Sequence, residues 1–179
     1  MPSGKDRLYV ALYARGGQPK MPTLEDTYHW ALIIGPKDES SEGRGWRFHA
    51  KEGLKQDGMI GWIFEEKEIP LGATQMLLVR ICVGKVEKNS RLKAILRDVP
   101  IRDNIAGWNC VYWVVEALKR LQEDGKAMGT SELDWTNLRN KAMAYIERKK
   151  QEHRFDGRGS FDMNKPATYD LLEGAETIP

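Results

Sequence analysis

The sequence predicts an α+β fold, with strands in the first half of the chain and helices in the second. The chain has 179 residues, 41% of them hydrophobic, which suits one domain with one core. Short apolar runs separated by glycine and proline recur up to residue 83 and are typical of strands. From residue 110 onward, apolar residues recur at the spacing of an amphipathic helix.

Each expected strand is a short run of apolar and aromatic residues that ends near glycine or proline. The polar stretch from Lys37 to Gly45 is expected to be an exposed loop. Because the runs follow one another closely, we expect the strands to pair antiparallel. The expected strands are Leu8–Ala14, Thr27–Ile34, Trp46–Ala50, Gly61–Ile69 and Gln75–Val83.

Each expected helix starts at a residue whose side chain can accept a hydrogen bond from a free backbone N–H of the first turn. Asn109 caps the helix expected over Cys110–Glu123, and Gly125 closes it. From residue 151 the chain turns polar, so residues 151–179 are expected to form an extended tail of one domain that spans residues 1–179. The expected starts of the other two helices are Asn89 or Ser90, and Ser131.

Charge and cysteine content exclude several classes of function. Lys and Arg total 28 and Asp and Glu total 26, so the net charge of +2 gives little attraction for phosphates, and no nucleic-acid partner is expected. No targeting segment is visible, and the run Trp30–Ile34 is too short to cross a bilayer, so no stable membrane anchor is expected. Cys82 and Cys110 do not make a disulfide framework, which favours the cytoplasm. The oligomeric state stays open.

Cys110 is the sharpest candidate for chemistry. Asn109 as N-cap places Cys110 in the first turn of a helix, where unpaired backbone N–H groups and the helix dipole favour a thiolate. A thiolate attacks carbonyl carbon, and the same N–H groups can stabilise the resulting oxyanion. The alternative is that Cys110 is a small buried residue at the start of a helix.

Two strand histidines could act on this thiol. His29 and His49 both lie in apolar runs that are expected to be strands. If these strands pair, the two imidazoles are neighbours. One imidazole could then take the thiol proton while the other holds the first in the right tautomer. The alternative is two unrelated structural histidines, each bonded to a backbone group. His153 lies among charged residues and is expected at the surface.

The order of these motifs resembles a known family. His29-Trp30-Ala31-Leu32 closes on Gly35, a strand histidine follows at His49, and Asn109-Cys110 opens a helix. This pattern resembles the circularly permuted papain-like and NlpC-type thiol enzymes, and its motifs are most similar to the lecithin:retinol acyltransferase family. Permuted members also include bacterial lipoprotein-like peptidases and the PPPDE isopeptidases. The whole chain resembles small uncharacterised fungal proteins.

The resemblance implies a permuted papain-like fold, with an antiparallel sheet packed against helices and the cysteine at a helix N-terminus. It implies Cys110 as nucleophile, His29 as general base and His49 as the group that orients His29. The expected activity is that of a cysteine hydrolase or acyltransferase, protease-like or acyl-transferring, that cleaves an amide, ester or thioester through an acyl-enzyme and needs no cofactor or metal. The acyl substrate could be a small molecule, a lipid or a peptide.

Four aromatic residues are candidates for substrate binding, and two other functions remain open. Two imidazoles and a thiolate can hold zinc with an open position, so His29, His49 and Cys110 could be a metal site. A non-catalytic binding module on the same fold is the second alternative. The aromatic candidates are Trp30, Trp108, Tyr112 and Tyr9, the last as a possible second oxyanion donor.

Overall fold

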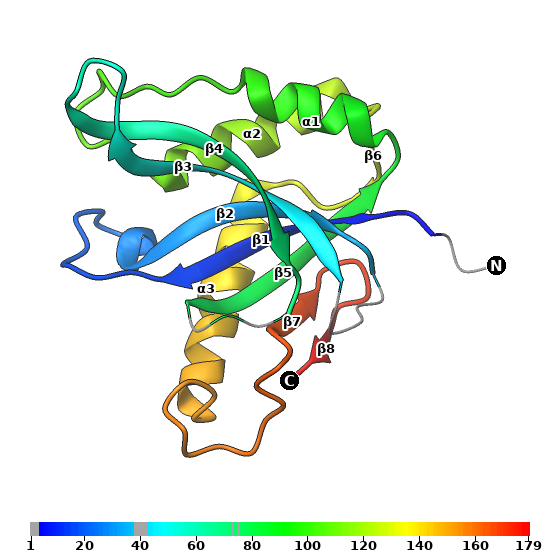
Figure 1. The fold of residues 1–179 in the computed structure, drawn as a ribbon. Coiled ribbons are helices and arrows are strands. Elements are labelled where there is room, and N and C mark those ends of the chain that lie inside the picture. The colour runs from blue at the N-terminus through cyan, green and yellow to red at the C-terminus, as the bar shows by residue number, and fades with distance from the viewer. Residues whose placement is uncertain (1–3, 38–42, 73, 75) are drawn as a thin grey trace.

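The computed structural model describes residues 4–37, 43–72, 74 and 76–179 of the chain. Within these residues it is an α+β fold, a mixed eight-stranded sheet packed against three helices (Figure 1). The elements are β1 (Arg7–Ala14), the 3-10 turn η1 (Glu25–Thr27), β2 (Tyr28–Gly35), β3 (Arg44–Leu54), β4 (Ile60–Pro70), β5 (Leu77–Val86), α1 (Asn89–Asp98), α2 (Cys110–Asp124), β6 (Met128–Ser131), α3 (Trp135–Gln151), β7 (Ala167–Asp170) and β8 (Ala175–Ile178).

The sheet is built around β1, which pairs antiparallel with both β2 and β5. The strand order is β4-β3-β2-β1-β5-β7-β8, and β6 pairs with the other end of β5. The first five strands pair antiparallel, but β7 runs parallel to β5. The expected antiparallel pairing of the first five strands is confirmed, but the sheet as a whole is mixed, because the chain returns from α3 to place β7 parallel to β5.

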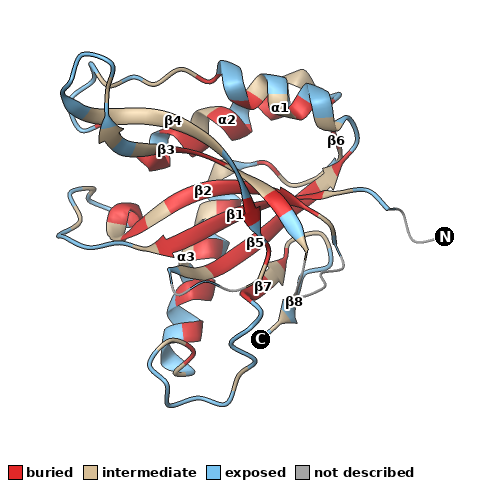
Figure 2. Cartoon of the chain, in the orientation of Figure 1, coloured by how far each residue is buried: buried red, intermediate tan, exposed pale blue. Residues whose placement is uncertain are grey.

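Side chains from the two faces of the sheet form two apolar clusters. Alternation along β1 sends Leu8, Val10 and Leu12 toward the helices, and Tyr9 and Tyr13 to the other face. We call the first cluster the helix-side core. Figure 2 shows the buried residues concentrated on the central strands and on the inward faces of the helices. The second cluster comprises Tyr9, Ala11, Tyr13, Ala31, Ile33, Ile69, Leu71 and Cys82.

Helix α2 lies at the centre of the helix-side core and has the predicted ends. The Asn109 side chain accepts a hydrogen bond from the Val111 N–H at 2.9 Å, and Gly125 closes the helix with a left-handed φ of 66°. The buried face of α2 includes Cys110, Trp113 and Val114. The cap fixes Cys110 as the first residue of this helix.

Helix α1 starts at Asn89, within the predicted region but with a different cap, whereas α3 does not start at the predicted Ser131. The N-cap of α1 is Lys88, and the Asn89 side chain instead donates to Asp6 at 2.7 Å. Ser131 belongs to β6, where it pairs with Gly84 of β5, so α3 begins later, after an Asp134 cap. Strand pairing outweighs the local preference of Ser131 for a helix start.

The C-terminal residues 151–179 carry β7 and β8, which the expectation of an extended tail did not include. Lys149 of α3 is fully buried, and its ammonium group pairs with Glu176 of β8 at 2.9 Å and with Glu152 at 2.7 Å. Tyr145 also donates to Glu176, at 2.6 Å. These contacts attach the tail to α3. Gln75, the expected start of the fifth strand, and residues 38–42 of the expected loop lie outside the described residues.

Strands β2 and β3 pair over a short stretch only. Their ladder runs from Leu32 to Ile34, so the preceding residues of β2 have no strand on that side in the described structure. Helix α2 contacts both strands, and Figure 1 shows it beginning where the β3–β4 hairpin diverges from β2. The divergence therefore makes room for the start of α2 beside the edge of β2.

The close approach of β3 to β2 depends on a glycine. A Cβ on Gly45 would lie 2.5 Å from the Ile34 carbonyl oxygen and 2.7 Å from Leu71 Cδ2. We expect Gly45→Ala to lower the free energy of unfolding by about 1–3 kcal/mol, because the backbone must shift to accept the methyl group. Gly16→Ala, whose Cβ would meet nothing within 4 Å, is the control and should change little. Urea denaturation measures both, and equal stabilities of the two variants would contradict this account.

Candidate functional site

Two histidines and one glutamate form a continuous chain of contacts across three strands. His29 Nε2 of β2 lies 2.6 Å from His49 Nδ1 of β3. His49 Nε2 lies 3.0 Å from a carboxylate oxygen of Glu65, its opposite partner on β4. The structure therefore brings together the two predicted histidines and adds Glu65, which the sequence reasoning missed.

Basic side chains of β3 hold the Glu65 carboxylate in place. Lys51 pairs with Glu65 at 2.8 Å and Arg47 at 3.2 Å. On the other side, Tyr13 of β1 lies edge-on to the His29 ring, with 6.1 Å between ring centroids, and Arg47 lies over the Tyr13 ring. Glu65 thus contacts the His49 end of the histidine pair, and Tyr13 contacts the His29 end.

Burial keeps both histidines neutral at pH 7. It is the largest of the effects that lower the pKa of His29 to about 3, and the adjacent His49 and Arg47 act in the same direction. Burial also lowers the pKa of His49 to about 4, against the opposing effect of Glu65. Burial acts to raise the pKa of Glu65, but the hydrogen bonds from Lys51, His49 and Arg47 outweigh it and lower that pKa to about 2. The chain is therefore two neutral imidazoles ending on a carboxylate.

Cys110 lies in the helix-side core with 0% of its surface exposed. Burial raises the pKa of its thiol, although the backbone N–H groups of Trp30, Cys110 and Val111 act in the opposite direction. The resting sulfur is thus a thiol at neutral pH. The effect of the Trp30 N–H places the sulfur beside the backbone of β2, at the residue that follows His29.

Cys110 belongs to the helix-side core, whereas the imidazole of His29 lies on the other face of β2. Alternation sends the Trp30 side chain to the helix-side core and the His29 side chain to the other face, and both residues lie in the part of β2 that the β3 ladder does not reach. The positive charge of Arg15 lowers the pKa of both His29 and Cys110. Within the described residues no hydrogen bond joins the Cys110 sulfur to either ring.

The four aromatic candidates for substrate binding lie at separate places. Trp30 is fully buried, and its indole N–H donates to the Glu25 carbonyl at 2.8 Å. Tyr9 lies in the second cluster, and its hydroxyl donates to the Pro36 carbonyl at 3.2 Å. Trp108 and the exposed Tyr112 line one shallow hollow beside α2. Of the four candidates, the structure therefore brings only Trp108 and Tyr112 together, near the start of α2.

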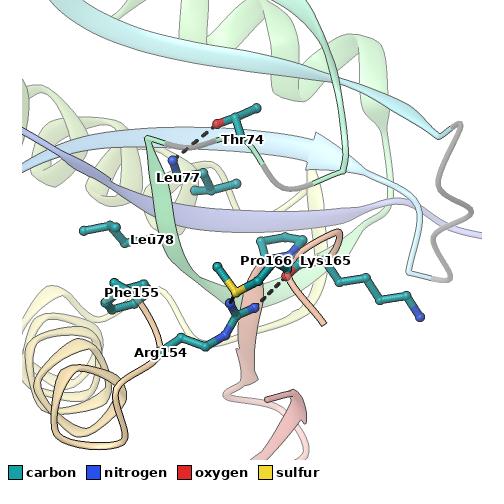
Figure 3. A pocket seen from close by; sticks show the side chains of 8 residues that line it. Thr74, Leu77, Leu78, Arg154, Phe155, Lys165 and Pro166 are labelled. Carbon is teal, nitrogen blue, oxygen red and sulfur yellow. Dashed lines mark hydrogen bonds between the residues drawn. The ribbon is translucent and has the colours of Figure 1, made fainter. Parts of the chain in front are cut away.

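A separate pocket lies at the C-terminal segment, away from these residues. Its volume is about 240 Å³, and Figure 3 shows the Arg154 side chain inside it. The Arg154 guanidinium donates to the Lys165 carbonyl at 2.7 Å, so this charge serves to attach the tail. The described lining comprises Thr74, Leu77, Leu78, Arg154, Phe155, Met163, Lys165 and Pro166 and includes no predicted site residue.

The zinc alternative finds no ligand set in the part of the chain that the structure describes. There, no group of three or more His, Cys, Asp or Glu side chains is arranged to hold a metal ion. His29 Nε2 and His49 Nδ1 also face each other at hydrogen-bond distance, which leaves neither atom directed at a shared ion. Across the described residues, no helix has both the length and the apolar composition to cross a membrane.

Comparison with protein families places nearly the whole chain in one of them, since a single family model matches residues 5–178. The chain belongs to DUF6914, a family of unknown function. No curated protein and no solved structure matches it. The relationship of this DUF6914 protein to papain-like enzymes therefore rests on its short motifs and stays a proposal.

Neutral buried histidines predict a loss of stability in acid. In the unfolded chain both would titrate near pH 6.5. In the fold, His49 remains unprotonated down to about pH 4 and His29 down to about pH 3. Between these values the unfolded state binds more protons, so stability is complete above about pH 6.5 and falls as the pH is lowered, by at most about 1.4 kcal/mol per pH unit for each histidine. Glu65 adds a further loss between its unfolded pKa of 4.5 and about 2.

Urea denaturation between pH 8 and pH 4 checks this expectation. The double variant His29→Gln, His49→Gln should show a flatter dependence on pH below about 6.5. His153→Asn serves as the control, because His153 is partly exposed, lies away from the histidine pair, and asparagine tolerates its left-handed φ of 62°. An unchanged slope in the double variant would contradict the assignment.

Proposed function

We propose that this DUF6914 protein is a cysteine–histidine thiol enzyme with a permuted papain-like arrangement, in which Cys110 is the nucleophile and His29 the general base. The single observation that supports it best is the His29–His49–Glu65 chain at the strand edge beside which the helix-leading sulfur lies. Thiol acyl chemistry requires a base and a group that orients this base, and His49 with Glu65 can orient His29 in this way. The proposed location is the cytoplasm, where the thiol stays reduced.

The proposed reaction begins from a neutral pair. His29 takes the proton from the Cys110 thiol as the sulfur forms a bond to the carbonyl carbon of an amide, ester or thioester, and the carbonyl oxygen becomes an oxyanion. Backbone N–H groups at the start of α2 face this oxyanion. The oxyanion then collapses, and the leaving group departs with the proton from His29. Water or an amine attacks the acyl-thioester, which releases the acid or the transfer product and the free thiol.

The proposed reaction requires a path to the sulfur, and the loop of residues 15–27 is its most direct cover. Its last turn, η1, contacts α2, and Met21 packs against the helix-side core. The Asp26 carboxylate accepts hydrogen bonds from the N–H groups of Lys20 at 2.7 Å and Met21 at 3.1 Å. Leu24, half exposed, has a left-handed φ of 69°, which non-glycine residues rarely adopt. Displacement of this loop would uncover the start of α2.

A reactive-probe panel tests the nucleophile and base. A vinyl-sulfone or thioester probe should label the wild type and not Cys110→Ala, and His29→Gln should slow labelling on the order of 10²-fold or more. Cys82→Ala is the matched control, because burial raises the pKa of Cys82 to about 11 and its side chain lies in the second cluster. Labelling that persists in Cys110→Ala, or moves to Cys82, would refute the nucleophile assignment and favour a non-catalytic binding module.

Arg139 of α3 fastens this loop and gives a test of access. It donates to the Glu25 carboxylate at 2.8 Å and to the Thr23 carbonyl at 2.8 Å. In a Cys82→Ala background, we expect Arg139→Gln to speed alkylation of Cys110 by iodoacetamide severalfold, since the loop opens more often. Arg148→Gln, on the same helix but paired with Glu152, is the control. Equal alkylation rates in both variants and the parent would place the opening elsewhere.

A further inference from the structure

We infer that Glu65 is a positioning residue of this site, which fixes through His49 the tautomer of His29 and makes His29 Nδ1 the atom that takes the thiol proton. The inference rests on the proposed function for its chemistry and on the His29–His49–Glu65 contacts for its geometry. No motif in the sequence marks Glu65, which lies in a polar run of β4.

The Glu65 carboxylate fixes the position of the first proton in the chain. Glu65 is paired with the side chains of Lys51 and Arg47, both of which carry positive charge, so its carboxylate is ionised. An ionised carboxylate can only accept hydrogen bonds. The 3.0 Å contact therefore requires a proton on His49 Nε2.

The tautomer of the second ring follows from that of the first. A neutral His49 that carries its proton on Nε2 has only a lone pair on Nδ1. The 2.6 Å contact between His49 Nδ1 and His29 Nε2 then requires His29 Nε2 to donate. A neutral His29 with its proton on Nε2 leaves Nδ1 as the one ring nitrogen of the pair that holds a lone pair outside these contacts.

The same chain supports the charge that develops in the reaction. When His29 Nδ1 accepts the thiol proton, the ring becomes a cation whose Nε2–H still donates to His49. His49 in turn donates to the Glu65 carboxylate, which favours the cation, whereas Arg47 and Arg15 oppose it. The other groups around the pair are Tyr13 of β1 and Lys51 of β3. Glu65 is thus the negative charge that offsets a basic neighbourhood.

Three variants separate this role from a merely structural one. Glu65→Gln keeps the size of the side chain but removes its charge, and its amide can donate as well as accept. Glu65→Asp keeps the charge with a shorter reach. Glu66→Gln is the matched control, because Glu66 is the next residue of β4 and pairs with Arg97 rather than with histidine. Urea denaturation of each variant establishes that it is folded under the conditions of the assay.

The first readout is the ¹⁵N spectrum of protein labelled at histidine, which separates ring nitrogens that carry a proton from those that do not. His153→Asn assigns the third histidine. In the wild type and in Glu66→Gln we expect both His29 and His49 to carry the proton on Nε2. In Glu65→Gln we expect a mixture of tautomers, and in Glu65→Asp a return toward the wild-type pattern.

The second readout is the rate at which the acyl probe labels Cys110 between pH 5 and pH 9. Glu65→Gln should lower the rate about tenfold at neutral pH and move the rise of the profile to a different pH, since a base that loses part of its support loses part of the 10²–10⁴-fold that general bases contribute. Glu65→Asp should recover part of the rate. Glu66→Gln should leave the profile unchanged.

The two readouts fail independently. A proton on His49 Nδ1 in the wild type, or a folded Glu65→Gln variant with unchanged tautomers and an unchanged pH profile, would overturn the role of Glu65. Absence of labelling at Cys110 in the wild type would instead refute the proposed function, and the nitrogen spectrum would still decide the tautomers.

Discussion

The contact between the Cys110 sulfur and the backbone of Trp30 is the constraint on which the candidate site depends. It requires β2 to present an unpaired edge, and β2 has one because its ladder with β3 begins only at Leu32. It also requires Cys110 to be the first residue of α2, which the Asn109 cap ensures. One open strand edge and one helix cap thus bring the Cys110 thiol to the residue that follows His29, although the side chains of Cys110 and His29 lie on different faces of the sheet.

Burial and charge act against each other at this site, and burial decides its resting state. The low dielectric of the interior disfavours both a thiolate at Cys110 and an imidazolium at His29. The one fixed negative charge of the chain, Glu65, lies two rings away and is shared with Lys51 and Arg47. A preformed ion pair would therefore be unfavourable here. In the proposed reaction, proton transfer from Cys110 to His29 must therefore accompany the formation of the bond between the sulfur and the carbonyl carbon. Opening of the site and entry of a substrate would also bring polar groups close to the thiol.

The sequence contained enough to predict the parts of the fold that are set locally. Apolar alternation found β1 and β2, and the Asn109 and Gly125 caps gave both ends of α2. Local patterns did not predict the segments whose structure depends on pairing with strands that are distant in the sequence. Ser131 has the local character of a helix cap, yet its pairing with β5 makes it a strand residue. Strands β7 and β8 are only four residues each, and they exist because β5 and the buried Lys149 provide partners that no local pattern reveals.

Glu65 was predictable in principle, from the turn that joins β3 to β4. Lys55 N–H donates to the Met59 carbonyl, and Gly58 has a left-handed φ of 82°, which is the pattern of a three-residue hairpin loop closed by glycine. Counting outward from that loop places His49 opposite Glu65. A shift of one residue would turn either side chain to the other face of the hairpin and break the chain of contacts. The register set by Gly58 therefore determines which carboxylate meets the histidine pair, and with it the direction in which both imidazoles carry their protons.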